Sequence, residues 1–393
     1  MPPKKQVEEK KILLGRPGNN LKAGIVGLAN VGKSSLFNAM TKAYLSAAEN
    51  FPFCTINPED SKVIVPSTRF DHLCELYKPK SEVPAFLTIT DIAGLVRGAA
   101  SGEGLGNEFL SHIRAVDALF QVVRCFDDAD IIHIEGDVDP ARDLEIVCNE
   151  LRLKDIEFAE KHLEGVHKIT RRGGQSLEVK QKKEEAALVE RIIELLKDGQ
   201  RIYNQNWAPK EIEIINSMLL LTAKPSIYLV NLSEKDYIRK KNKHLIKIKE
   251  WVDKNSPGDL IIPFSVALEE RLAPLTGDDL KAEEEKIGAT SAFTKMITSM
   301  RKKMDLISFF TSGADEVREW TIRDGTKAPA AAGVIHNDLQ KTFILAEIMK
   351  YKDIEELKDE KAVKAAGKLH TKGKDYVMED GDIVYFRAAA GKS

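Results

Sequence analysis

Residues 22–34 read KAGIVGLANVGKS, an apolar run that passes directly into the pattern G-x-x-x-x-G-K-S at 27–34. A short apolar run is typical of a buried strand, and residues 35–40 (SLFNAM) continue with helical spacing. Glycines at such a turn let the backbone wrap an anion, so that N–H groups and the helix N-terminus point at it. The segment predicts a phosphate-binding loop, with Lys33 at the β/γ oxygens and the Ser34 hydroxyl on Mg²⁺.

A chance glycine turn is the alternative, and two further motifs argue against it. Residues 86–90 (FLTIT) predict another strand, which ends in D-I-A-G at 91–94. Ligands of open α/β sheets lie at the carboxyl ends of strands, so we expect Asp91 in the Mg²⁺ shell. Thr55 lies between the motifs in a turn-rich stretch, which suits a loop ordered by Mg²⁺ and the γ-phosphate. Together they predict a purine triphosphate hydrolase that works as a conformational switch.

A later apolar run ends in N-L-S-E at 231–234. Regulatory GTPases carry N-K-x-D there, and its aspartate accepts two hydrogen bonds from guanine; here the lysine is Leu232 and the aspartate is Glu234. An unmatched buried polar edge costs about 1–3 kcal/mol, enough to lose guanine discrimination, whereas Leu232 offers an apolar surface to a purine. Ser265, after the strand pattern of 260–264, is expected to form a second wall for the base. The pattern favours adenine as the base. The alternative is a GTPase in which Glu234 still recognises guanine.

The spacing of these motifs indicates an insertion. Asp91 and Asn231 are 140 positions apart, whereas two βα steps need roughly 60. Residues 143–153 and 184–196 place apolar side chains at i, i+3 and i+4, which predicts an antiparallel helical hairpin.

Beyond residue 300 the pattern changes to short strands. Candidates are 306–310, 319–322 and 383–386, while 343–349 fits a strand or a helix. These segments predict a small mixed α+β domain.

The motifs together resemble the Obg-like ATPases, the YchF subfamily of translation-factor-type P-loop proteins. The segments that carry the resemblance are 27–34, 91–98, 102–106 and 231–234, and residues 326–329 and 365–382 resemble the family's C-terminal TGS domain. The resemblance implies an α/β fold with a Ras-like P-loop domain at 16–139 and 216–300. It also implies an inserted helical coiled coil at 140–215 and a β-grasp TGS domain at 303–388.

The family's activity implies an ATP-preferring hydrolase associated with ribosomes, translation and stress responses. The expected nucleotide-binding residues are Asn30, Val31, Gly32, Lys33, Ser34, Ser35, Asn231, Leu232, Glu234 and Ser265. The expected Mg²⁺ ligands are Ser34, Thr55 and Asp91. Asn30 also stands where several K⁺-stimulated P-loop hydrolases hold the ion, although a plain loop residue is the alternative.

The sequence lacks the glutamine that ordinary GTPases use in catalysis. Ordinary GTPases place glutamine directly after D-x-x-G to orient the attacking water, and this chain has Leu95, which has no donor or acceptor. We expect His112, after a glycine-rich segment, to take that role beside Lys33, because neutral imidazole can accept a hydrogen bond from water. A surface helix residue, with the orienting group supplied by a partner, is the alternative.

Length and charge indicate the number of domains and the kind of partner. The chain has 393 residues, which predicts two or three domains, and a formal net charge of only −2. Residues 235–249 hold seven Lys/Arg against one Asp, which indicates either a contact with ribosomal RNA or a solvated helix face. A ribosome- or protein-binding scaffold with nucleotide as a structural ligand is the rival function. Further partners are expected through the helical and TGS domains.

The four cysteines form no C-x-x-C pair, and residues 1–11 contain no apolar signal region. We therefore expect a cytoplasmic protein with no membrane contact.

Overall fold

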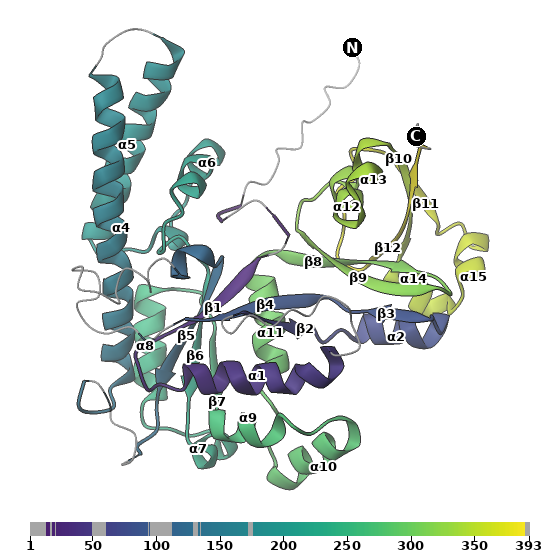
Figure 1. Cartoon of the computed structure of the whole chain (residues 1–393), viewed down its shortest axis with the longest axis horizontal. Helices are drawn as coiled ribbons and strands as arrows, with labels where there is room; N and C mark the ends of the chain where they lie inside the picture. The colour runs from purple at the N-terminus through teal and green to yellow at the C-terminus, as the bar shows by residue number, and fades with distance from the viewer. Residues whose placement is uncertain are drawn as a thin grey trace.

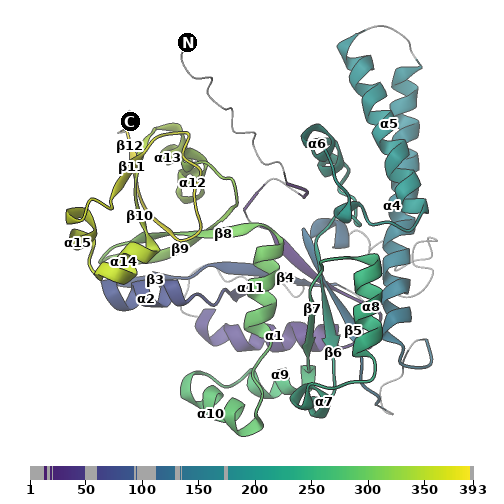
Figure 2. The ribbon, with the colours of Figure 1, turned by 180° about the vertical axis from the view of Figure 1, so that it is seen from behind.

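The computed structural model describes residues 13–15, 18–19, 21–48, 60–92, 94, 112–128, 133, 135–171 and 176–389. Figure 1 shows two sheets, with a long helical hairpin projecting beside the first, and Figure 2 shows the same arrangement from behind. None of the helices in these ranges is long and apolar enough to cross a bilayer.

The first sheet carries the phosphate-binding loop. Its strand order is β2-β4-β1-β5-β6-β7, and only β2 runs antiparallel to its neighbour. The strands are β1 (Lys22–Val26), β2 (Asp60–Ile64), β4 (Phe86–Asp91), β5 (Ala118–Arg124), β6 (Ser226–Asn231) and β7 (Ile261–Phe264). All of β5 and β6 is buried, as expected for parallel strands covered on both faces, which explains their continuous apolar runs. This is the Ras-like sheet that the sequence predicts.

Helices cover both faces of this sheet. Helix α1 (Lys33–Ala48) contacts α9 (Val266–Leu272) and strands β1, β2 and β4. Helix α4 (Pro140–Thr170) contacts β5 and α8 (Leu245–Asn255), and these two helices lie on the other side of the sheet from α1. The remaining helices of this part are α6 (Pro209–Met218), α7 (Glu234–Arg239), α10 (Gly277–Ile287), α11 (Phe293–Lys303) and the short 3-10 turn Ile202–Asn204.

The predicted insertion is a helical hairpin between β5 and β6. It consists of α4 (Pro140–Thr170) and α5 (Leu177–Lys197), which pack along each other. Asp139 caps α4 by accepting from the Arg142 N–H, and Ser176 caps α5 in the same way. At 31 residues α4 is about 46 Å long, so it runs from the sheet well beyond the surface of the first domain.

A buried carboxylate fixes the middle of α4. Asp155 is fully buried and accepts the backbone N–H groups of Leu221 and Thr222, at 2.9 and 2.8 Å, and the Thr222 hydroxyl at 2.6 Å. Burial raises its pKa to about 6, and these three donors oppose the shift. Since residues 221 and 222 lie just before β6, the contact ties the hairpin to the central sheet.

The second sheet has the order β11-β10-β12-β8-β9-β3. Its strands are β8 (Leu306–Ser312), β9 (Glu316–Arg323), β10 (Phe343–Lys350), β11 (His370–Lys372), β12 (Asp382–Ala388) and β3 (Ser81–Val83). The β8–β9 hairpin, the packed helix α12 (Ala328–Ile335) and the pairing of β12 parallel to β8 make the β-grasp arrangement. Short helices α13 (Asn337–Lys341), α14 (Tyr351–Leu357) and α15 (Glu360–Ala365) complete it. Residues 343–349, which fit either structure, form a strand.

The two sheets share the segment 60–92. Strand β3 pairs in parallel with β9, so it belongs to the C-terminal sheet although β2 and β4 on either side of it belong to the first. Helix α2 (Thr68–Tyr77) packs its Phe70 and Leu73 against Phe310. Non-local pairing of this kind leaves no local pattern, and the sequence did not predict it.

The sequence suggested that the basic segment 235–249 is one helix, but the structure shows two helices with a turn between them. Helix α7 ends at Arg239, Lys240 has the left-handed backbone conformation (φ 54°), and α8 begins at Leu245. The side chain of Asn242, between the helices, binds the Cys125 carbonyl and Asp236, which stabilises the turn.

Candidate nucleotide site

The loop between β1 and α1 needs its glycines. Gly27 has a φ of 157°, and a Cβ there would collide with the carbonyl oxygen of Val122. Gly32 has a φ of 98°, and a Cβ would lie 2.5 Å from the side-chain nitrogen of Asn231. Asn30 also has a positive φ, of 62°, a conformation that asparagine tolerates better than most residues. The backbone can therefore wind closely enough to present its N–H groups to phosphates.

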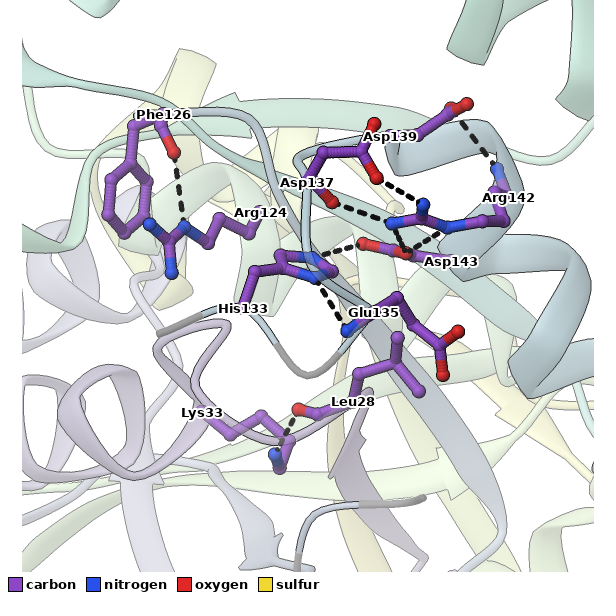
Figure 3. A network of polar contacts seen from close by, with 10 residues as sticks. All are labelled: Leu28, Lys33, Arg124, Phe126, His133, Glu135, Asp137, Asp139, Arg142 and Asp143. Atoms are coloured by element: carbon purple, nitrogen blue, oxygen red, sulfur yellow. Dashed lines mark hydrogen bonds and ion pairs between the residues drawn. The ribbon is translucent and has the colours of Figure 1, made fainter. Parts of the chain in front are cut away.

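Lys33 begins α1 and reaches back across this loop. Its side chain is buried, and its ammonium donates to the Leu28 carbonyl at 2.7 Å (Figure 3). Burial lowers the pKa of Lys33 to about 8, and the negative charge of Asp91 opposes that shift. A bound polyphosphate would supply further negative partners, so the buried amine is suited to an anion.

The oxygen donors expected for Mg²⁺ flank the loop. Asp91 ends β4, in register with Ile25 of β1, and Ser34 is exposed at the start of α1. Within the described ranges no group of three or more acidic, His or Cys side chains could hold a metal. Mg²⁺ is usually held by one or two protein oxygens together with phosphates and water, so Asp91 and Ser34 are suitable donors for it. Thr55 lies outside the described residues.

Gly94 brings the second motif against the first. A Cβ on Gly94 would lie 2.9 Å from the Cα of Ala29, so the two backbones are in close contact. The glycine of D-x-x-G thus borders the phosphate loop. Leu95 and the glycine-rich segment after it lie outside the described residues. His112 is half-buried in a helical turn at 112–115.

Asn231 joins the phosphate loop to the base-reading end, which we define as the predicted base site at residues 231–234 and Ser265. Its fully buried amide donates to the Val31 carbonyl at 3.0 Å and accepts from the Val266 N–H at 3.1 Å. One side chain therefore holds the loop and the start of α9 together.

The other predicted base-site residues surround this contact. Leu232 is 2% exposed and packs in an apolar cluster that includes Tyr237 and Leu245, which leaves little of its side chain to face a purine. Ser265 is fully buried, and its hydroxyl has no hydrogen-bond partner among the described residues, so it could serve a polar ligand atom. Glu234 begins α7, and its carboxylate forms an ion pair with Arg271 at 2.9 Å. Val31 is buried, Gly32 and Ser35 are half-buried, and Asn30 is exposed.

Figure 3 shows, in one view with Lys33, a polar network around His133 and Asp143 that the sequence analysis missed. His133 accepts the Glu135 N–H at its Nδ1, at 3.1 Å, so the neutral ring carries its proton on Nε2 and donates to Asp143 at 2.8 Å. Arg142 bridges Asp143 and Asp137 (Figure 3). Burial raises the pKa of Asp143, against the effect of His133 and Arg142. The network fixes the start of α4; the only sequence signal is a cluster of aspartates.

A second missed residue, Glu269, lies on α9 behind the base-reading end. Its carboxylate is fully buried and accepts the Ala292 N–H at 2.7 Å and the Ser291 hydroxyl at 2.6 Å. Burial raises the pKa of Glu269 to about 7 and the nearby Glu284 adds to the shift, while the two donors oppose it.

Comparisons with known proteins agree with this geometry. A family described as a 50S ribosome-binding GTPase matches residues 22–158, and the YchF GTPase C-terminal family, described as a protein of unknown function, matches 306–389. Obg-like ATPase 1 of Saccharomyces cerevisiae is 71% identical over 394 residues, covering 100% of both chains. Obg-like ATPase 1 of Homo sapiens is 53% identical and covers 98% of both. The solved structure of the Schizosaccharomyces pombe YchF GTPase matches with a TM-score of 0.89 at 59% identity, over 96% of this chain and 100% of that one.

The raised pKa of Glu269 predicts a pH-dependent stability. The folded chain keeps this proton up to about pH 7, whereas the unfolded chain loses it near 4.5, so this group stabilises the fold less as pH rises between those values. Glu269→Gln, which mimics the protonated acid, should have the same free energy of unfolding as the wild type near pH 4 and exceed it by roughly 1–3 kcal/mol at pH 8. Urea unfolding at both pH values measures this, with the exposed Glu285→Gln as control. A stability difference that is the same at both pH values would contradict the assignment.

Proposed function

The chain belongs to the Obg-like ATPase (YchF) family of nucleotide-hydrolysing enzymes, and from that premise we propose that it hydrolyses ATP to ADP and phosphate as a Mg²⁺-dependent conformational switch. The observation that carries the choice of ATP is N-L-S-E at 231–234. There Leu232 stands in place of the lysine of guanine-reading proteins, and Glu234 stands in place of their aspartate. The relatives support the class of reaction, but their names divide between ATPase and GTPase, so a GTPase is the second candidate.

Each part of the proposed site has a role in phosphoryl transfer. The backbone of residues 30–35 would bind the phosphates, and Lys33 would place its charge on the β/γ oxygens. Ser34 and Asp91, with Thr55, would hold Mg²⁺, which neutralises charge that develops on the phosphates. Asn231 would keep the phosphate loop and the base-reading end in register through its two hydrogen bonds.

The nucleotide preference is tested directly by binding. We expect slowly hydrolysed ATP analogues to bind more tightly than the matching GTP analogues in calorimetry. The double variant Leu232→Lys, Glu234→Asp should shift the preference toward GTP, because it restores the guanine-reading pair. Lys235→Gln, an exposed neighbour, is the control. A lower dissociation constant for GTP in the wild type would refute the adenine assignment.

The catalytic assignment concerns His112. We propose that it orients the attacking water in place of the glutamine of ordinary GTPases, so turnover without a partner should be slow, on the order of 10⁻⁴–10⁻² s⁻¹. His112→Ala should lower the single-turnover rate about tenfold or more, with ATP affinity within about twofold, because the contact forms mainly in the transition state. Hydrolysis at the wild-type rate would instead point to a group supplied by a partner.

We include K⁺ in the proposal through Asn30, whose exposed position in the loop would let it help hold the ion near the phosphates. Equal hydrolysis rates in K⁺ and Na⁺ buffers would refute this role of K⁺ and Asn30.

The proposed partner is the ribosome in the cytoplasm, with contact to ribosomal RNA through the exposed cations around α7 and α8. Arg239, Lys240 and Lys241 lie together at the end of α7 and are exposed. Ion pairs engage several neighbouring cations, such as Lys243 with Asp127, but these pairs are exposed and weak. Further partners through the hairpin and the C-terminal domain remain an expectation.

If these cations contact phosphates, ribosome binding should weaken steeply with salt through counterion release. Changing Arg239, Lys240 and Lys241 to Glu should reduce co-sedimentation with ribosomes without changing ATP affinity. The matched control replaces three exposed lysines of the C-terminal domain: Lys352, Lys358 and Lys361. If both triple variants co-sediment like the wild type, α7 and α8 only present a solvated face.

A scaffold role is the rival from a different class. It predicts that Lys33→Ala, which removes the phosphate-binding charge, keeps full cellular function.

A further inference from the structure

An ion pair engages the acidic residue at the base-reading position. Arg271 places Nη1 2.9 Å from Oε1 of Glu234, and its Nε lies 3.8 Å from the carboxylate of Glu283. The three residues come from α9, α7 and α10. The pair is partly exposed, with 33% of the Glu234 side chain and 43% of the Arg271 side chain accessible.

The fold places both partners at the same end of the sheet. Glu234 follows β6 by three residues, and α9, which carries Arg271, begins two residues after β7. Strands β6 and β7 are paired up to Asn231 and Phe264. The contact between Asn231 and Val266 then holds the start of α9 beside the end of β6. The arginine is therefore built into the segments that form the base-reading end.

The chemistry of the two purines gives this pair a consequence. Guanine presents two adjacent N–H donors, which need both oxygens of an ionised carboxylate that is free to accept them. Adenine presents an acceptor nitrogen beside its amino group, and an ionised carboxylate facing that nitrogen would repel it. Arginine on one oxygen of Glu234 removes an acceptor from guanine and also neutralises the charge that disfavours adenine.

We propose that Arg271 is a specificity-determining residue, which favours adenine over guanine by holding the carboxylate of Glu234 away from the base. The inference rests on the proposed preference for ATP and deepens it, because it adds a determinant outside the N-L-S-E motif. Arg271 acts through Glu234 and needs no contact with the nucleotide.

The test is a double-mutant cycle on the full-length chain, with ADP and GDP as probes so that hydrolysis does not interfere. Calorimetry gives both dissociation constants for the wild type, Arg271→Gln, Glu234→Gln and the double variant. Arg271→Gln should shift the ADP-to-GDP affinity ratio toward GDP by about fivefold, a size that a partly exposed ion pair can supply. In the Glu234→Gln background the same substitution should change the ratio less than twofold.

Two further variants isolate the ion pair. Arg271→Lys keeps a cation on α9 and should recover part of the wild-type ratio. Arg191→Gln removes a partly exposed arginine of α5 that pairs with Glu211 instead, and it should leave the ratio unchanged.

The outcomes separate this inference from the function on which it rests. A wild type that binds GDP more tightly than ADP overturns both. A wild type that prefers ADP, with an unchanged ratio in Arg271→Gln, overturns only the role of Arg271. Equal losses of ADP and GDP affinity in Arg271→Gln would assign the residue to the packing of α9 and also overturn the inference.

Discussion

The buried amide of Asn231 is the contact on which the nucleotide site depends. An amide can donate and accept at the same time, and Asn231 does both, to the Val31 carbonyl and from the Val266 N–H. Replacing Asn231 with aspartate would remove the donor. Replacing it with alanine would leave two buried backbone groups without a hydrogen bond, at a cost of about 1–3 kcal/mol each. The contact also explains Gly32, because a Cβ there would collide with the amide nitrogen. The glycine pattern of the loop therefore depends on a residue about 200 positions away in the chain.

A second constraint comes from the chain that both sheets share. Strand β3 lies in the C-terminal sheet and ends at Val83, and β4, which carries Asp91, begins at Phe86. Arg69 of α2 forms two hydrogen bonds of 3.0 Å with Asp380, which also accepts the Ser308 N–H. The C-terminal domain is thus docked on the segment that leads into the D-x-x-G motif.

Sequence reasoning succeeded where the chemistry is local. The P-loop, the strand before Asp91 and the apolar spacing of 143–153 and 184–196 each lie within one short window, so their elements could be predicted. The sequence could not predict the buried anchors Asp155, Glu269 and His133, because each depends on hydrogen-bond partners that the fold brings to it. For Glu269 these are Ser291 and Ala292, more than twenty positions away. The prediction of one helix over 235–249 was wrong for a local reason. The repeated lysines gave no signal of the turn at Lys240.

The helical hairpin depends on the same central sheet at two levels. At its base, His133 and Arg142 hold Asp143 at the start of α4 (Figure 3). Further along α4, Asp155 fastens the helix to the backbone just before β6, the strand that ends in Asn231. Because α4 is continuous between these anchors, a force on the projecting hairpin is resisted at both, and the second anchor lies directly before β6. The hairpin is therefore joined to the nucleotide site by buried polar contacts, which are costly to break and whose geometry leaves little freedom to slide.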